Sequence, residues 1–162
     1  YISVTGVQTC ALPIFLDAYR GGYVPPHLKT KEFYQECAAK LADDGVLLTY
    51  LHATTALFYA DLKTLADVFP QIVLFRNSEN PGNVIACAVK YRTPVVTDTT
   101  KWPAPATLNG PLQGRVDMAR VMGERMAWPA EDIAKYNAKV ITDDFGSPEL
   151  LDAIQIGNTK EK

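Results

Sequence analysis

The sequence predicts an α/β fold built around an open sheet, and three observations support this prediction. Short apolar runs typical of buried strands alternate with segments in which apolar residues recur at helical spacing. Loops rich in glycine and proline separate these segments. The last two strand-like runs are joined by a short cluster of turn residues, which favours an antiparallel hairpin over a helical crossover. We therefore expect the second half of a parallel sheet that ends in an antiparallel hairpin.

The first strand and the first helix flank a loop. Phe15–Leu16 is expected to end a buried strand, and Asp17 follows it directly. Arg20–Pro26 contains paired glycines and paired prolines, which predict a loop. Thr30 can cap a helix that Asp43–Gly45 is expected to stop. The apolar positions of this helix recur at helical spacing: Phe33, Cys37, Ala38 and Leu41.

A second strand and helix follow. Val46–Leu51 is a continuous apolar run rich in strand-forming residues, as in a parallel strand buried on both faces. Thr54 is expected to open the next helix and Pro70 to end it. Ile72–Phe75 and Val84–Val89 then predict the two strands of the hairpin. The apolar stripe of the second helix comprises Phe58, Leu62, Leu65 and Phe69.

The C-terminal third has a different character. Thr93–Pro111 holds four prolines and is predicted to be an extended segment. The next helix should end at Trp128–Pro129, and Glu131–Tyr136 should add a further turn or two. Ser147 can cap another helix at the end of the loop Val140–Glu149. The apolar stripe expected in the first of these helices comprises Leu112, Val116, Ala119, Met122 and Met126.

Composition excludes several classes of protein. The formal net charge of −2 gives no basic field that would gather nucleic acid. No apolar run approaches the ~18 residues that span a bilayer, so we expect a cytoplasmic domain without a membrane segment. Cys10, Cys37 and Cys87 are odd in number and far apart, which predicts neither a disulfide framework nor a metal site.

The N-terminal residues differ in kind from the rest. Val4–Ile14 matches the conceptual translation of a sequencing-library adapter, whereas a signal peptide would need a basic start and a longer apolar core. We therefore expect residues 1–14 to be non-native. Residues 15–90 should form the second half of the sheet, and residues 91–162 should pack on the same domain. Ala11–Ile14 is nevertheless apolar enough to extend the first strand backward.

Candidate site residues gather at one edge of the predicted sheet. Parallel strands present their carboxyl ends at the same edge, where open α/β sheets bind ligands. Asp17 and Tyr50–His52 both follow such strand ends. Asp17 can face a ligand or can cap local backbone amides, and position alone gives the two alternatives equal weight. His52 is a candidate for ligand contact at the same edge.

Two further places are weaker candidates. His27 stands between a proline pair and a helix start, where a surface or packing role is the alternative to substrate binding. Asp143 and Asp144 can form an amine or metal site, although paired acids near a turn more often face solvent or cap the turn. The sequence contains no nucleophile elbow and no phosphate-binding loop.

Several motifs together resemble one family. They are Leu16–Tyr19, Val24–Phe33, Leu41–Leu47 and Thr142–Pro148. In this combination they resemble the polyamine aminopropyltransferases, the spermidine synthase family. They are most similar to its bacterial spermidine-synthase-like members, some of which are fused to membrane transporter-like segments. The resemblance implies a Rossmann-like fold of the S-adenosylmethionine-dependent methyltransferase type, in agreement with the predicted sheet.

The resemblance also implies a chemistry. In the family an amine attacks the carbon beside the sulfonium of decarboxylated S-adenosylmethionine, and acidic side chains hold the amine and take its proton. On this basis Asp17 is the catalytic residue, and Asp17 with Ala18 contacts S-adenosylmethionine or its decarboxylated form. The expected partner is a small-molecule amine or polyamine. The candidate substrate-binding residues are Tyr19, His27, His52, Asp143 and Asp144.

One residue departs from the family pattern. Arg20 stands where the family's Asp-x-x-Asp loop has its second acid. A guanidinium ~4–6 Å from a substrate ammonium would cost on the order of 1–4 kcal/mol, depending on the effective dielectric. This disfavours putrescine as the acceptor. The alternatives are a different nucleophile, transfer of a methyl group, or loss of activity.

The sequence leaves three functional hypotheses. The first is a spermidine synthase-like transferase, inactive as this chain because the glycine-rich loop and the ribose-binding acid of the fold's first half are absent from these residues. The second is a non-catalytic binding or regulatory domain of the same fold, fused to a membrane transporter-like segment. The third is a small-molecule methyltransferase in which Asp17 positions the substrate. The parent protein is compatible with a homodimer and with attachment to a membrane.

Overall fold

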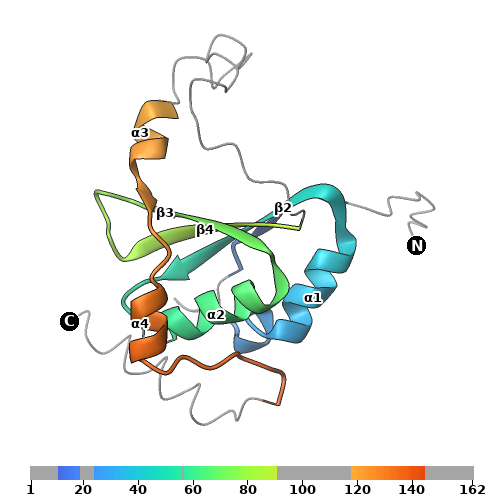
Figure 1. Cartoon of the computed structure of the whole chain (residues 1–162). Coiled ribbons are helices and arrows are strands. Elements are labelled where there is room, and N and C mark those ends of the chain that lie inside the picture. Colours follow the sequence, from blue (N-terminus) through green and yellow to red (C-terminus); the bar gives the residue numbers. More distant parts are fainter. Residues whose placement is uncertain (1–10, 19–23, 56, 91–117, 145–162) are drawn as a thin grey trace.

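The computed structural model describes residues 11–18, 24–55, 57–90 and 118–144. In this part of the chain, five strands form one mixed sheet in the order β1-β2-β4-β3-β5. Helices α1, α2 and α4 lie on the same side of the sheet (Figure 1). The strands are β1 (Ala11–Leu16), β2 (Leu41–His52), β3 (Gln71–Arg76), β4 (Asn83–Val89) and β5 (Arg125–Met126). The helices are η1 (Pro26–Leu28), α1 (Lys31–Lys40), α2 (Phe58–Val68), α3 (Met118–Gly123) and α4 (Ala130–Lys135).

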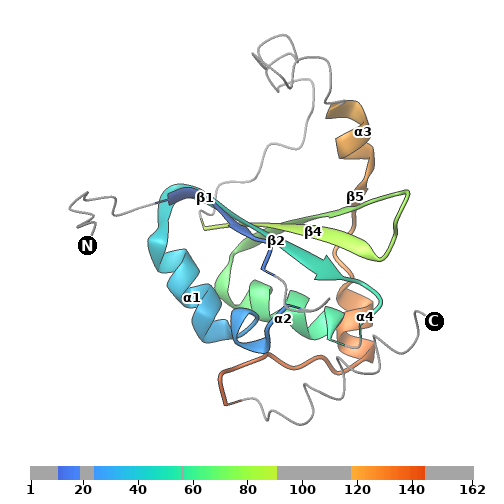
Figure 2. The ribbon, with the colours of Figure 1, turned by 180° about the vertical axis from the view of Figure 1, so that it is seen from behind.

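The strand pairing confirms the α/β class and the antiparallel hairpin. β1 runs parallel to β2, and β3 pairs with β4 in antiparallel fashion. β4 also pairs antiparallel with β2, so it lies between β2 and β3. β2 and β3 therefore point in the same direction but do not pair with each other. Figure 2 shows β1 at one side of β2, at the edge of the sheet.

The first helix starts where the sequence predicts and ends earlier. The backbone N–H of Phe33 donates to the Thr30 hydroxyl over 3.3 Å, which is the expected cap. The prediction that Asp43–Gly45 stops the helix is wrong, because β2 already begins at Leu41. The Leu41 side chain is fully buried, and its backbone carbonyl accepts from Lys90 Nζ over 3.1 Å. The residues from Leu41 onward therefore belong to β2, although local spacing assigned them to the end of the helix.

The second helix starts later than expected. Thr54 does not open it, because residues around His52–Thr55 form a turn in which both the backbone N–H and the hydroxyl of Thr55 donate to the His52 carbonyl. α2 then begins at Phe58. Its predicted apolar stripe is confirmed as core, since all four residues are buried: Phe58, Leu62, Leu65 and Phe69.

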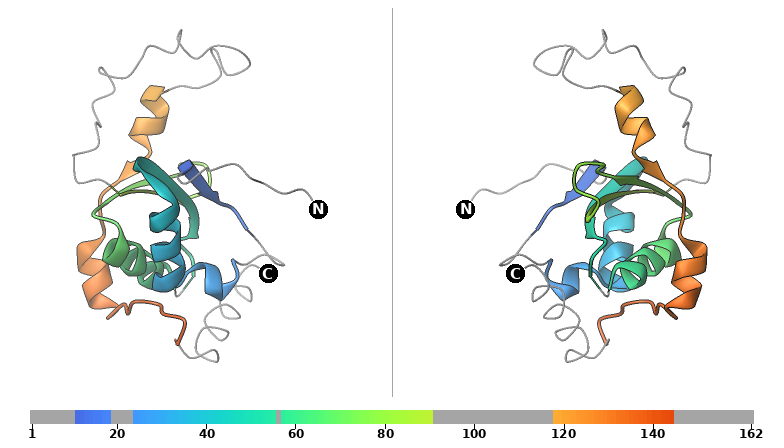
Figure 3. Two further views of the ribbon diagram at one scale, coloured as in Figure 1. Left: turned by 90° about the vertical axis from the view of Figure 1, so that its right-hand side faces the viewer. Right: turned by 90° about the vertical axis from the view of Figure 1, so that its left-hand side faces the viewer.

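The hydrophobic core fills the space between the sheet and the helices. Alternate residues of β2, including Leu47 and Leu51, point into it and are buried. Val84 and Ala86 of β4 are also buried. Figure 3 shows α1, α2 and α4 gathered on this side.

The other side of the sheet carries exposed apolar side chains. Phe15 is 70% exposed, so the prediction that it lies in a buried strand is wrong. The reason is its place in the edge strand, on the side away from α1 and α2. Its register partner in β2 is Leu48. On β4, Ile85 is 38% exposed.

The C-terminal elements complete the sheet edge. α3 ends at Gly123, and Met126 belongs to β5 and not to the predicted helix, because it pairs with Leu74 of β3. The prediction that this helix ends at Trp128–Pro129 is wrong, because α3 ends at Gly123 and β5 follows it. The short helix predicted after Pro129 is present as α4. Three predicted features lie outside the described residues: the extended segment 93–111, the helical residues 112–117 and the cap at Ser147.

Candidate active site at the carboxyl edge of the sheet

Asp17 follows the carboxyl end of β1 and is exposed. The parallel register pairs Leu16 with Thr49, so Asp17 comes level with the Tyr50–His52 end of β2. The structure thus brings the two predicted strand ends to one edge. Ala18 is also exposed there, whereas Tyr19 and Arg20 lie outside the described residues. An exposed carboxylate at this place can accept hydrogen bonds from an amine.

A small cluster of polar side chains lies at the C-terminal end of β2. The Tyr50 hydroxyl donates to Asn83 Oδ1, and His52 Nδ1 lies 2.8 Å from the Thr54 hydroxyl. The rings of Tyr50 and His52 meet edge to face, with centroids 6.0 Å apart. Gly82 lies beside Thr54 and His52, and its carbonyl accepts from the Ala53 backbone N–H. Asn83 was missed by the sequence analysis, because it comes from β4 and lies opposite His52 only through the strand register.

An ion pair joins the turn that carries His27 to α2. η1 places His27 on the surface, and Lys29 follows the turn directly. Lys29 Nζ donates to Asp61 Oδ2 over 2.6 Å, and the Asp61 side chain is fully buried. Sequence analysis missed this pair. A signal was present, since Asp61 stands three positions after Phe58 and one before Leu62, on the apolar face of the helix.

Burial dominates the electrostatics of Asp61. It raises the pKa of the carboxyl group above its ordinary value, while the ammonium of Lys29 acts in the opposite direction. Oδ1 is buried and has no hydrogen-bond partner in the described part of the chain. Tyr34 of α1 is buried nearby, and its pKa is raised well above 10.0 by burial and by the charge of Asp61.

The segment Ala138–Asp144 lies against the start of α1 and the second half of α2. The Lys31 backbone N–H donates to the Ile141 carbonyl over 2.8 Å, and the Ile141 N–H donates to the Thr64 hydroxyl over 2.9 Å. The Asp143 N–H donates to Glu32 Oε2 over 3.0 Å. These bonds bring the exposed Asp143–Asp144 pair to the N-terminus of α1, beside the predicted His27 segment.

The predicted site residues therefore form two groups. Asp17 and His52 lie at the ends of adjacent strands, and His27 lies with Asp143 and Asp144 around the start of α1. Both helix N-termini face this edge, because α1 follows β1 and α2 follows β2. Among the described residues, no cluster of histidine, cysteine and acidic side chains is arranged to hold a metal ion.

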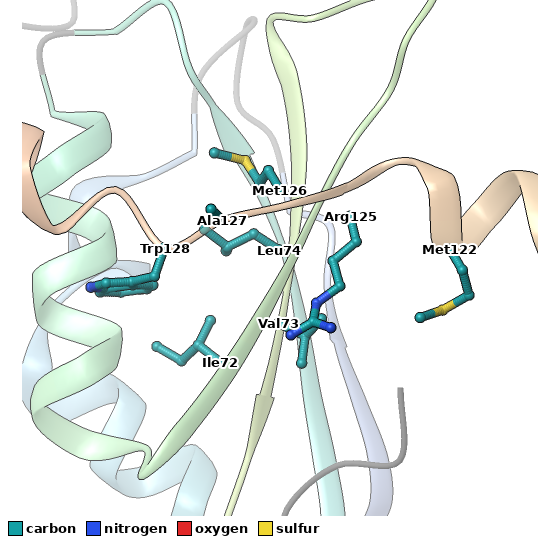
Figure 4. Close-up of a pocket in the computed structure, with 8 residues that line it drawn as sticks. All are labelled: Ile72, Val73, Leu74, Met122, Arg125, Met126, Ala127 and Trp128. Atoms are coloured by element: carbon teal, nitrogen blue, oxygen red, sulfur yellow. The ribbon is translucent and has the colours of Figure 1, made fainter. Parts of the chain in front are cut away.

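A cavity of about 500 Å³ lies elsewhere, between β3 and the segment from α3 to β5 (Figure 4). Apolar side chains dominate its lining, and Arg125 and Met122 lie on one side of it. None of the predicted site residues contributes. The lining residues are Ile72, Val73, Leu74, Met122, Arg125, Met126, Ala127 and Trp128.

Comparison with known proteins agrees with the motifs. Over 81 residues the chain is 32% identical to a polyamine aminopropyltransferase from Vibrio vulnificus, a match that covers 50% of this chain and 27% of that protein. A solved structure of a probable spermidine synthase from Corynebacterium glutamicum aligns with a TM-score of 0.55 and 14% identity, over 86% of this chain and 50% of that chain. This chain thus spans about a quarter of the first protein and half of the second.

A third similarity is to human Methyltransferase-like protein 13 in complex with SAH, with a TM-score of 0.48 and 20% identity over 77% of this chain and 54% of that chain. No protein-family model matches the chain.

These comparisons bear on the fold and on the family. The likeness to the structure of the probable spermidine synthase shows a mixed α/β fold, in agreement with the expected Rossmann-like methyltransferase type. The sequence match supports a spermidine synthase-like family, as the motifs predict. In the described residues no helix has the length and apolar character needed to cross a membrane.

Proposed function

We propose that this chain is part of a spermidine synthase-like transferase. Its donor is a sulfonium nucleoside, S-adenosylmethionine or the decarboxylated form, and its acceptor is a small amine. The observation that carries the proposal is the place of Asp17 directly after β1. The 32% identity to a polyamine aminopropyltransferase over 81 residues supports it. The chain's spermidine synthase-like fold supports the same class of reaction.

The proposed reaction forms one bond and breaks another. The lone pair of the neutral amine attacks the carbon beside the sulfonium, and the carbon–sulfur bond breaks with its electrons going to sulfur. The nucleoside leaves as a neutral thioether. The attacking nitrogen releases a proton, which Asp17 accepts as general base.

The candidate residues also bind and orient the two substrates. We assign Asp17 and Ala18 to contact with the donor, and Tyr19, His27 and His52 to contact with the acceptor. Asp143 and Asp144 supply further negative charge on the acceptor side. The chemistry of this set fits a cation, because Glu32, held against the Asp143 backbone, adds a third carboxylate at the same place.

Arg20 favours a second candidate function. It stands three positions after Asp17, where the family has an acid, and its charge opposes binding of a diamine near Asp17. A monoamine acceptor or a small-molecule methyltransferase would meet less of this repulsion. In the methyltransferase Asp17 positions the substrate and needs no basic role.

The test measures product formation by the purified full-length protein. Release of methylthioadenosine from decarboxylated S-adenosylmethionine indicates aminopropyl transfer, and release of S-adenosylhomocysteine from S-adenosylmethionine indicates methyl transfer. We expect Asp17→Asn to lower kcat about 10²–10⁴-fold if Asp17 is the general base. Asp43→Asn is the matched control, since Asp43 is an exposed aspartate near the opposite end of β2. Failure to bind either donor would overturn the proposal.

A further inference from the structure

α2 carries a charged residue on its buried face. Asp61 lies among core residues of the helix, with Phe58 and Leu62 beside it, and its side chain has no exposed surface. Its ion-pair partner, Lys29, is 32 positions away in the sequence and is only 11% exposed. The two groups join the helix to the segment between η1 and α1.

Such a pair is a poor source of stability. Removing two charges from water costs several kcal/mol for each ion, and apolar side chains of similar volume often serve a core equally well. Oδ1 of Asp61 adds to this cost, because it is buried without a hydrogen-bond partner in the described part of the chain. The pair does fix the position of Lys29. Moving the ammonium away would leave the buried carboxylate of Asp61 unpaired, which costs several kcal/mol.

The position of Lys29 determines that of its neighbours. The turn before it is closed by bonds from the Leu28 and Lys29 backbone N–H groups to the carbonyls of Pro25 and Pro26. Thr30 directly after it caps α1. Fixing Lys29 on α2 therefore fixes both the exposed His27 and the start of α1, against which Asp143 is held.

We propose that Asp61 is a positioning residue for the acceptor side of the site. It acts through Lys29, which it holds on α2, and so sets the place of His27 and of the α1 N-terminus relative to the strand ends. This inference rests on the proposed function, because it assumes that these groups contact an amine substrate.

The test compares variants of the pair in the full-length protein. Asp61→Asn removes the charge and keeps the shape, and Lys29→Met removes the ammonium and keeps the alkyl chain. The double variant Lys29→Met/Asp61→Leu replaces the pair by apolar groups that the core can accommodate, so it remains informative if the single variants unfold. Asp43→Asn is the control, because Asp43 forms a surface ion pair with Lys90, at 3.7 Å, near the start of β2 and away from the α1 N-terminus.

The readout is the affinity for two probes, putrescine and n-butylamine, together with KM and kcat for whichever amine is used. We expect Kd and KM to rise about tenfold in each pair variant, or 1.4 kcal/mol, with kcat at saturation nearly unchanged. The double variant should be no weaker than the single ones, since all three break the same contact. Lys29→Arg keeps the positive charge and should keep much of the affinity, and Asp43→Asn should behave like the unaltered protein.

Two results would overturn the inference and can be told apart. If the double variant is folded and binds both amines as tightly as the unaltered protein, the pair is merely structural and the proposed function stands. If the unaltered protein binds neither amine, the proposed function fails and the inference fails with it. Circular dichroism and thermal unfolding establish which variants are folded.

Discussion

Two aspartates show how surroundings decide the role of a residue. Asp17 is exposed at a strand end and is available to a ligand, whereas Asp61 is buried and paired with Lys29. The first could be placed from the sequence, because an acid that directly follows an apolar run is expected at the carboxyl edge of the sheet, where open α/β sheets bind ligands. The second could not be assigned, because its partner is distant in the sequence and helical spacing says nothing of that partner.

Tyr34 gives a prediction at alkaline pH. Burial raises its pKa well above 10.0, while in the unfolded chain the group ionises near that ordinary value. As the pH rises above 10, the unfolded state therefore loses a proton that the folded state keeps, and the free energy of unfolding falls. Tyr34→Phe removes this contribution, so its stability should fall less steeply between about pH 9 and 11.

Urea unfolding followed across this pH range measures the slope. Tyr136→Phe is the matched control, since Tyr136 is 59% exposed on the surface. Equal slopes for Tyr34→Phe and the unaltered chain would contradict the assignment. Tyr34→Phe should also be less stable at neutral pH, because the hydroxyl interacts with Thr49.

At the scale of the element, α2 holds the segments that carry one group of site residues, His27 with Asp143 and Asp144. Asp61 holds the segment before α1, and Thr64, one turn further along, holds Ile141. Lys63 adds a bond from its ammonium to the Ala138 carbonyl over 2.7 Å. The apolar stripe of α2 was predictable from spacing, but the polar residues between its members form contacts that spacing does not reveal.

Thr64→Val tests the attachment of the C-terminal segment. The substitution keeps the shape and removes the hydroxyl that accepts from the Ile141 N–H, leaving a buried donor unpaired. We expect a loss of about 1–3 kcal/mol in the free energy of unfolding and faster amide exchange at Ile141. Thr64→Ser keeps the hydroxyl and should restore slow exchange. Unchanged protection of Ile141 in Thr64→Val would contradict the role of this hydrogen bond.

Element boundaries show where local spacing is insufficient. The cap at Thr30 is confirmed because it depends on neighbours within one turn. The start of β2 at Leu41 was not predicted, since Asp43–Gly45 has the composition of a helix stop. Pairing of β2 with β1 decided that boundary.

At the scale of the whole molecule, the two sides of the sheet differ. α1, α2 and α4 cover one side, as Figure 3 shows, while Phe15 and Ile85 on the other are 70% and 38% exposed. β1 is also an edge strand of the described sheet. Exposed apolar surface beside an open edge favours association between copies of a chain.

We therefore expect this 162-residue chain, expressed alone, to aggregate. Phe15→Lys should reduce light scattering at a given concentration, because it places a charge on the exposed side of the edge strand. Its effect on stability should stay within about 0.5 kcal/mol, as for other exposed positions. Tyr136→Lys, on the helix side, is the control and should leave scattering unchanged. A monodisperse chain with a cooperative thermal transition would contradict this prediction.

The sequence by itself determined the features that depend on neighbouring residues. These are the stripe from Phe58 to Phe69, the Thr30 cap, the β3–β4 hairpin and the place of Asp17 after a strand. Spacing and short-range hydrogen bonding specify them, so each can be predicted from a few adjacent residues.

Only the tertiary structure decided how distant segments meet. It inserted β4 between β2 and β3, joined Lys29 to Asp61, and brought Asp143 to Glu32, 111 positions earlier. These contacts arise because the sheet and the α2 face bury their apolar surface together and fix which polar groups are enclosed. No local pattern encodes that choice, since it depends on the packing of the whole core.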